Sequence, residues 1–210
     1  MAVLIRDVTL RETRPTDAGA CGPLLFATWP SLYRALLGEE HHAFAVLSRL
    51  FAAPGNTFSY DATRLAERNG HVVGIASAYP ADQGQRRARA SLGPALRVLG
   101  PVGFTRVLRA VWRIADASMG VDHRHWYVAN VAVIPQERGS GLGSLLLADA
   151  EDRARARGLR AVSLELDGDS PAVRRFYERA GYVVVEERNS VPLRELTGNG
   201  RRLLMSKALA

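Results

Sequence analysis

Apolar residues recur along this chain with two spacings, and the two spacings predict different elements. Alternating or continuous apolar stretches predict strands. These stretches are residues 3–12, 57–67, 71–79, 123–133, 161–166, 182–187 and 201–207. Helical spacing predicts helices. These cover residues 17–28, 39–53, 101–117, 142–157 and the stretch from Ser170-Pro171 to Gly181. Strands and helices interleave, so we expect one mixed α/β sheet of about seven strands.

Turn and cap residues punctuate these stretches. Asn69-Gly70 separates two strand patterns and predicts a tight hairpin, because both residues tolerate positive φ. Thr16 or Asp17 can cap the first helix, and Trp29-Pro30 is expected to end it. Ser170 can cap the last helix through its hydroxyl, with Pro171 in its first turn.

A glycine-rich loop follows the strand that ends in Val131-Ala132-Val133. The loop contains Arg138-Gly139-Ser140-Gly141-Leu142-Gly143-Ser144 and leads into a helix. Glycines at a helix start let the backbone approach an anion, and the free N–H groups of the first turn favour negative charge. The order Arg-x-x-Gly-x-Gly is neither that of a P-loop, which requires a lysine, nor the spacing of the dinucleotide fingerprint.

This loop resembles the acyl-CoA-binding motif of the GNAT superfamily of N-acetyltransferases. A second stretch, Asp169 to Tyr182, resembles a later segment of the same family, although Ser170 stands where the family commonly has Asn. The resemblance covers residues 125–187 and extends weakly to Leu10–Asp17. It implies one GNAT-like domain over residues 1–210, with a mixed, mostly antiparallel sheet, flanking helices and a helical insertion at 81–122 between strands 3 and 4.

The resemblance also implies acetyl-CoA as co-substrate. Backbone N–H groups of the glycine loop would hold its pyrophosphate, and the preceding strand would pair with its pantetheine arm. That pairing requires this strand to separate from strand 162–166. The implied cofactor-binding residues are Val131, Ala132, Val133, Arg138, Gly139, Ser140, Gly141, Leu142, Gly143, Ser144, Ser170 and Tyr177.

Tyr177 has two interpretations. The resemblance implies that it is the general acid that protonates the departing thiolate. Alternatively, Val173, Phe176, Tyr177 and Ala180 form an apolar stripe at helical spacing, and Tyr177 is then a core residue.

A base is also needed to accept a proton from the amine. The candidates that the sequence leaves open are His123, His125, Glu165 and, through a water, Asn130. No metal site is expected, because His41-His42 has no Cys, Asp or Glu at ligand spacing.

Composition narrows the class of partner. The formal net charge is +7 and the sequence pI is about 10.3, which raises nucleic-acid binding as a hypothesis. Of 28 basic residues only Lys207 is a lysine, a skew that looks like codon bias, so nucleic acid is not the expected partner. No apolar run is long enough for a membrane span, no secretion signal is recognised, and Cys21 has no partner, so we expect a cytoplasmic protein.

The leading hypothesis is an N-acetyltransferase in which a primary amine attacks acetyl-CoA directly in a ternary complex. The alternative is a non-catalytic acyl-CoA-binding or regulatory module. The acceptor, a small molecule or a peptide amine, cannot be identified from the sequence, and a homodimer is possible. The helix at 39–53 and the insertion at 81–122 are expected to line the acceptor pocket. The amphipathic helix at 101–117 is either a packed surface helix or a lid over that pocket.

Overall fold

The computed structural model describes residues 7–209, and one seven-stranded sheet organises them. The strands are β1 (Val8–Glu12), β2 (Thr63–Arg68), β3 (His71–Pro80), β4 (Trp126–Val133), β5 (Ala161–Asp167), β6 (Val183–Asn189) and β7 (Arg201–Ala208). Their order is β1-β2-β3-β4-β5-β7-β6. All neighbours are antiparallel except β4 and β5, which are parallel. The expected mixed, mostly antiparallel sheet is confirmed.

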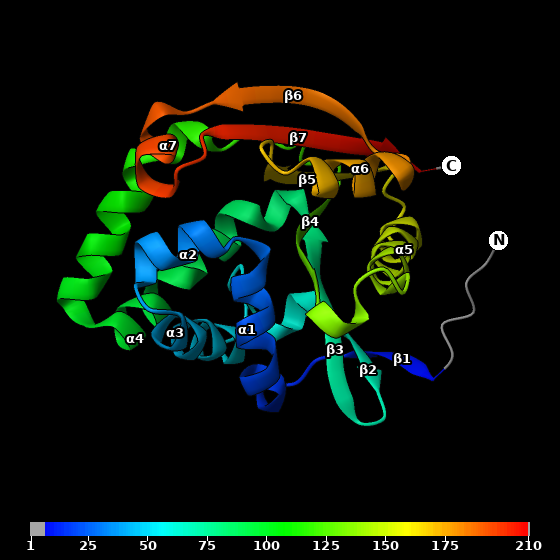
Figure 1. Ribbon diagram of the computed structural model, residues 1–210, viewed down its shortest axis with the longest axis horizontal. Coiled ribbons are helices and arrows are strands. Elements are labelled where there is room, and N and C mark those ends of the chain that lie inside the picture. Colours follow the sequence, from blue (N-terminus) through cyan, green and yellow to red (C-terminus); the bar gives the residue numbers. More distant parts are fainter. Residues whose placement is uncertain (1–6, 210) are drawn as a thin grey trace.

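Seven α-helices flank the sheet (Figure 1). They are α1 (Ala18–Thr28), α2 (Pro30–Leu37), α3 (Glu40–Ala52), α4 (Gly84–Arg113), α5 (Leu142–Ala156), α6 (Pro171–Arg179) and α7 (Val191–Thr197). Helices α1 to α3 lie on one side of β3 and β4, and α5 lies on the other. Adjacent strand residues divide between these layers: Leu65 and Ile75 pack with α1 to α3, whereas Ala66 and Ala76 pack with α5.

The hairpin between β2 and β3 forms as predicted. Asn69 has φ 50° and Gly70 has φ 77°, the left-handed pair that a tight hairpin turn requires. The predicted strand 57–67 begins only at Thr63, however: residues 57–58 lie in a turn, and Tyr60–Ala62 form a short 3-10 helix. The Asn56 side chain accepts a hydrogen bond from the Phe58 N–H at 2.8 Å, and Ser59 accepts one from the Asp61 N–H at 3.3 Å. These local bonds compete with strand pairing.

Two short helices were not predicted. The first helix ends at Thr28, where Trp29-Pro30 was expected to end it, but Pro30 also opens α2, because proline suits the first turn of a helix. Helix α7 begins at a capping serine, whose hydroxyl accepts the Leu193 N–H at 3.1 Å. Two caps were wrong: neither Asp17 nor Ser170 makes a side-chain cap to the helix that follows it. The first strand is β1, and residues 3–6 of its predicted range lie outside the described residues.

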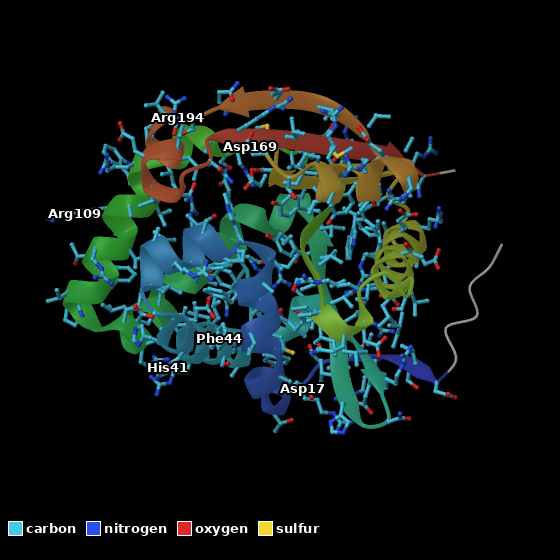
Figure 2. All side chains as sticks on the ribbon, in the orientation of Figure 1. Asp17, His41, Phe44, Arg109, Asp169 and Arg194 are labelled. Atoms are coloured by element: carbon cyan, nitrogen blue, oxygen red, sulfur yellow. The ribbon has the colours of Figure 1, made fainter. Side chains whose placement is uncertain are left out.

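The insertion between β3 and β4 is the long helix α4, which begins earlier than the predicted 101–117 and ends at Arg113, before a short 3-10 helix at Ala115–Ala117. Helix α4 bends at Gly100, where φ is 67°. Val107 and Ala110, with Ile114 just beyond the helix, pack against the core, whereas Leu108 and Val111 are each nearly half exposed. Arg109 lies at the outer edge of α4 (Figure 2). Within residues 7–209, no helix is both long and apolar enough to cross a membrane.

Candidate functional site

Strands β4 and β5 are paired over only three residues each. Trp126, Tyr127 and Val128 face Val162, Ser163 and Leu164, and beyond these pairs the two strands part. The remainder of β4 keeps its ladder with β3 as far as Val133. Because backbone groups alternate between the two edges of a strand, this stretch of β4 directs part of its N–H and C=O groups toward the opening. The separation that pantetheine binding requires is therefore present.

A β-bulge explains where the strands part. In the β3–β4 register Ser77 pairs with Asn130 and Ala78 pairs with Val128, so Ala129 is the extra residue. A bulge bends its strand and increases the local twist. The bend begins immediately after Val128, the last residue of β4 that pairs with β5.

The opening between the strands is the mouth of a cavity of about 500 Å³. Its walls come from the α1–α2 junction, the turn before β2, and strands β3, β4, β5 and β7, with α6 closing one side. The lining includes Thr28, Trp29, Tyr33, Phe58, Tyr79, Tyr127, Ala129, Asn130, Val131, Glu165, Asp167, Ser170, Tyr177 and Arg202. Of the predicted site residues, Val131, Ser170 and Tyr177 are therefore brought together here.

Tyr177 is a core residue and a lining residue at the same time. Its side chain is buried and packs edge-on against Phe176 and Tyr182. Burial raises the pKa of its hydroxyl above the ordinary tyrosine value, so the group is protonated at neutral pH and can donate a hydrogen bond. Among the described residues it has no hydrogen-bond partner. The two interpretations of Tyr177 are thus compatible.

The glycine loop connects the end of β4 to α5. Gly139 and Gly141 have φ 80° and 89°, which side chains rarely adopt, so glycine is required at both positions. Helix α5 begins at Leu142, and its first backbone acceptor, Gly141 C=O, is bonded by Leu145. The N–H groups of Leu142, Gly143 and Ser144 therefore lack helical partners, as at any helix start.

The third glycine of the loop, Gly143, is needed for a different reason. A Cβ on Gly143 would lie 3.3 Å from the Phe176 ring, so this residue permits α5 to pack closely against α6. The contact places the start of α5 beside the helix that carries Tyr177. Two N–H groups of the predicted set are already used inside the loop: Arg138 donates to Pro135 and Ser140 to Glu137.

Charged groups around the loop are arranged to leave it positive. The Glu137 carboxylate is held by Arg68 at 2.7 and 2.9 Å. Arg138 is exposed and forms no ion pair with the described residues, so its guanidinium is available to a ligand. Ala132 and Val133 pack into the apolar layers on either side of β4, and only their backbone can serve the opening.

A buried ion pair lies deeper in the cavity. Arg202 of β7 donates to Glu165 of β5 at 3.3 Å, and both side chains are about one-tenth exposed. The Arg202 guanidinium also lies over the Trp29 ring, 4.0 Å from its centroid. Burial raises the pKa of the Glu165 carboxyl above its usual value, although Arg202 acts in the opposite direction.

The four candidate bases differ in whether they line the cavity and in whether they can ionise. His123 is largely exposed in the loop before β4, and His125 contacts the Ser163 hydroxyl at 2.8 Å outside the cavity. Asn130 lines the cavity, but its carbonyl accepts the Thr28 hydroxyl at 3.0 Å. Glu165 is the one candidate that is both ionisable and in the cavity.

Several residues that line the cavity belong to no recognisable sequence motif and were not predicted. Tyr79, Tyr127 and Arg202 come from three different strands, and Trp29 comes from the α1–α2 junction. The sheet order and register bring the three strand residues together. Burial keeps two of the phenols neutral, raising the pKa of Tyr79 to about 12 and that of Tyr127 well above its usual value. Contrary to expectation, neither 39–53 nor 81–122 contributes a described lining residue. The insertion acts on the wall indirectly, since Arg87 lies over the Tyr79 ring.

Cys21 is fully buried in α1, and burial raises its pKa to about 12, as suits an inert thiol. Within residues 7–209, no group of three or more His, Cys, Asp or Glu side chains is arranged to hold a metal ion.

Comparison with known proteins adds an independent line of argument. The sequence model of the acetyltransferase (GNAT) family matches residues 26–182. No curated protein matches the chain.

Solved structures with the same fold include an acetyltransferase with 24% sequence identity, which spans 96% of this chain and 100% of its own, with a TM-score of 0.70. An N-acetyltransferase from Staphylococcus aureus Mu50 has 13% identity, 94% and 99% coverage, and a TM-score of 0.69. The PaiA N-acetyltransferase from Thermoplasma acidophilum, in complex with coenzyme A, has 12% identity, 96% and 98% coverage, and a TM-score of 0.55. At these identities the likeness concerns the fold.

Proposed function

We propose an activity from one premise: the chain belongs to the acetyltransferase (GNAT) family. The proposed activity is transfer of an acetyl group from acetyl-CoA to a primary amine, with both substrates bound together. The observation that carries it is the parting of β4 from β5 beside the free N–H groups of α5. This arrangement offers one edge to an extended amide chain and a positive helix end to a diphosphate.

In the proposed complex, main-chain groups hold the cofactor. Backbone groups of Val131, Ala132 and Val133 pair with the pantetheine amides, as an added strand would. The pyrophosphate lies against the loop from Arg138 to Ser144. Gly139, Gly141, Leu142, Gly143 and Ser144 are the proposed donors there, because the N–H groups of Arg138 and Ser140 are used within the loop. Ser170 lines the same opening, and its hydroxyl is free of a capping role.

The proposed reaction needs one proton donor and one proton acceptor. Glu165 takes a proton from the ammonium group of the acceptor, and the neutral nitrogen attacks the thioester carbonyl carbon. The carbon–sulfur bond breaks, and the departing thiolate receives the proton of the Tyr177 hydroxyl. The tyrosinate oxygen then takes the extra proton from the nitrogen as the amide forms, which restores Tyr177. The protonated state of Tyr177 and the raised pKa of Glu165 support these roles.

A panel of primary amines incubated with acetyl-CoA tests the activity. We expect release of the free thiol of coenzyme A to depend on the amine, and N-acetylated forms of the same amines to be inactive. If acetyl-CoA binds but no amine, amino acid or peptide in the panel is acetylated, the protein is the non-catalytic acyl-CoA-binding module instead. Calorimetry with duplex DNA in the same buffer checks the disfavoured nucleic-acid hypothesis.

Substitution at the glycine loop tests the cofactor site. Gly141→Ala forces a side chain into a left-handed position at the α5 start, and Gly158→Ala does the same at the other end of the helix, where φ is 71°. Each should lower the free energy of unfolding by about 1 kcal/mol. Only Gly141→Ala should weaken acetyl-CoA binding, by about tenfold, the contribution of one hydrogen bond to a charged group. Denaturant unfolding and calorimetry measure the two effects, and equal losses of affinity would contradict the assignment.

Removal of one hydroxyl tests the proton donor. Tyr177→Phe should lower kcat by about 10²-fold, because the thiolate would depart without a positioned acid. Acetyl-CoA affinity and stability should change little, since the hydroxyl has no described partner to lose. Tyr182→Phe is the control: it packs against Tyr177 but donates to Glu151 at 3.1 Å, so it should cost stability and leave kcat near wild type. A wild-type kcat in Tyr177→Phe would show that Tyr177 has only a structural role.

The pH dependence of kcat/KM tests the base. Glu165 must be ionised to accept a proton, and burial raises its pKa, so kcat/KM should fall with decreasing pH at a higher pH than an exposed glutamate would give. Glu165→Gln should lower kcat/KM by about 10²-fold near neutrality. Its defect should shrink as the pH rises toward the pKa of the amine. Glu187→Gln, at an exposed carboxylate paired with Arg201, should retain the wild-type profile, and an unchanged profile in Glu165→Gln would exclude this base.

A further inference from the structure

Arg202 is a buried cation with most of its hydrogen-bonding capacity unused. The residue is 7% exposed and lines the cavity. A guanidinium has five N–H donors, and within residues 7–209 only one bond is made, to Glu165 at 3.3 Å. A buried charge is costly unless it is paired and hydrogen-bonded. The free donors of Arg202 are thus suited to an anionic group that enters the cavity.

The geometry around Arg202 leaves its edge rather than its face available. Trp29 covers one face of the guanidinium, with 4.0 Å between the guanidinium carbon and the ring centroid. Stacking of this kind leaves the planar fork of donors open at the edge, where a carboxylate can bind with two parallel hydrogen bonds. Arg202 contacts Glu165 through one carboxylate oxygen only, Oε2.

The neighbouring carboxylate does not compete for Arg202. Asp167 lies opposite Arg202 in the β5–β7 register. Its oxygens accept the Asp169 N–H at 3.0 Å and the Asn199 side-chain amide at 3.1 Å. These bonds hold Asp167 in place, and its charge keeps the cavity from being positive as a whole, which disfavours a ligand that is only anionic.

We infer that the acceptor is an amino acid, whose ammonium group is bound by Glu165 and whose carboxylate is bound by Arg202. The inference rests on the proposed function and names its substrate class. Glu165 and Arg202 lie side by side, and the two charged groups of an α-amino acid are separated by a single carbon. The zwitterion therefore meets a complementary pair of charges without breaking the existing bond. Aromatic rings from Tyr33, Phe58 and Tyr79 line the same cavity and suit an apolar or aromatic side chain.

Three matched acceptors test this inference: phenylalanine, phenylalaninamide and phenethylamine. They share one side chain and differ at the carboxylate. We expect kcat/KM for phenylalanine to exceed that of the other two by at least about 30-fold, as for loss of a buried charged partner. Arg202→Gln should remove this preference: all three acceptors lose rate because Glu165 loses its partner, but phenylalanine should lose at least about 30-fold more than phenethylamine. Equal rates for the three acceptors in wild type would overturn the inference.

Control variants separate ligand binding from support of Glu165. Arg201→Gln alters the adjacent arginine, which pairs with Glu187 on the protein surface, and should keep the wild-type preference. Arg202→Lys retains the charge but not the fork, and should recover part of the preference. If Arg202→Gln instead lowers all three acceptors equally, Arg202 only positions Glu165 and the inference is wrong.

A binding measurement keeps the inference independent of turnover. Calorimetry with coenzyme A present should detect phenylalanine binding to wild type and its loss in Arg202→Gln, with thermal unfolding confirming that the variant is folded. Absence of phenylalanine binding at millimolar concentration would overturn the inference. If no amine is acetylated but phenylalanine binds through Arg202, the proposed function fails while the carboxylate site stands.

Discussion

The parting of β4 from β5 is the structural constraint on which the candidate site depends. The two strands share only three residue pairs, and the bulge at Ala129 turns β4 away just after the last of them. Without that separation, the free edge of β4 would pair with β5 along its whole length, and the cavity between the two strands would close. The same opening exposes main-chain groups on one side and admits side chains from β5 and β7 on the other.

The two halves of the proposed site are built by different means. On the cofactor side, the proposed contacts come from the backbone of β4 and the start of α5, which glycines with positive φ make accessible. On the acceptor side, the contacts come from Glu165 and Arg202, which lie on adjacent strands and meet diagonally across the β5–β7 register. Packing of Gly143 against Phe176 fixes one half relative to the other, because it ties the start of α5 to the helix that carries Tyr177.

This division explains how much could be predicted from the sequence. The glycine loop, the strand before it and Tyr177 form local patterns, and the sheet and its order of helices follow from hydrophobic spacing. Arg202 and Trp29 belong to no motif; their meeting depends on which strands pair and in what register, which single-sequence periodicity does not contain. Helices α2 and α7 were missed for another reason: at eight and seven residues they are too short to show a periodicity, so only their proline and serine starts mark them.

The insertion between β3 and β4 contains a helix, as predicted, but the role predicted for that helix was wrong. Helix α4 was expected to line the acceptor pocket, yet it packs against the outside of α2 and α3, and its N-terminal half places Arg87 over the Tyr79 ring. Amphipathic spacing identifies a helix that covers something apolar, but it does not identify what is covered. Six residues in and just after α4 pack against the core: Ala95, Val98, Leu99, Val107, Ala110 and Ile114. A supporting helix of this kind differs from a lid, because a lid must also present side chains to the cavity, and α4 lines none of it.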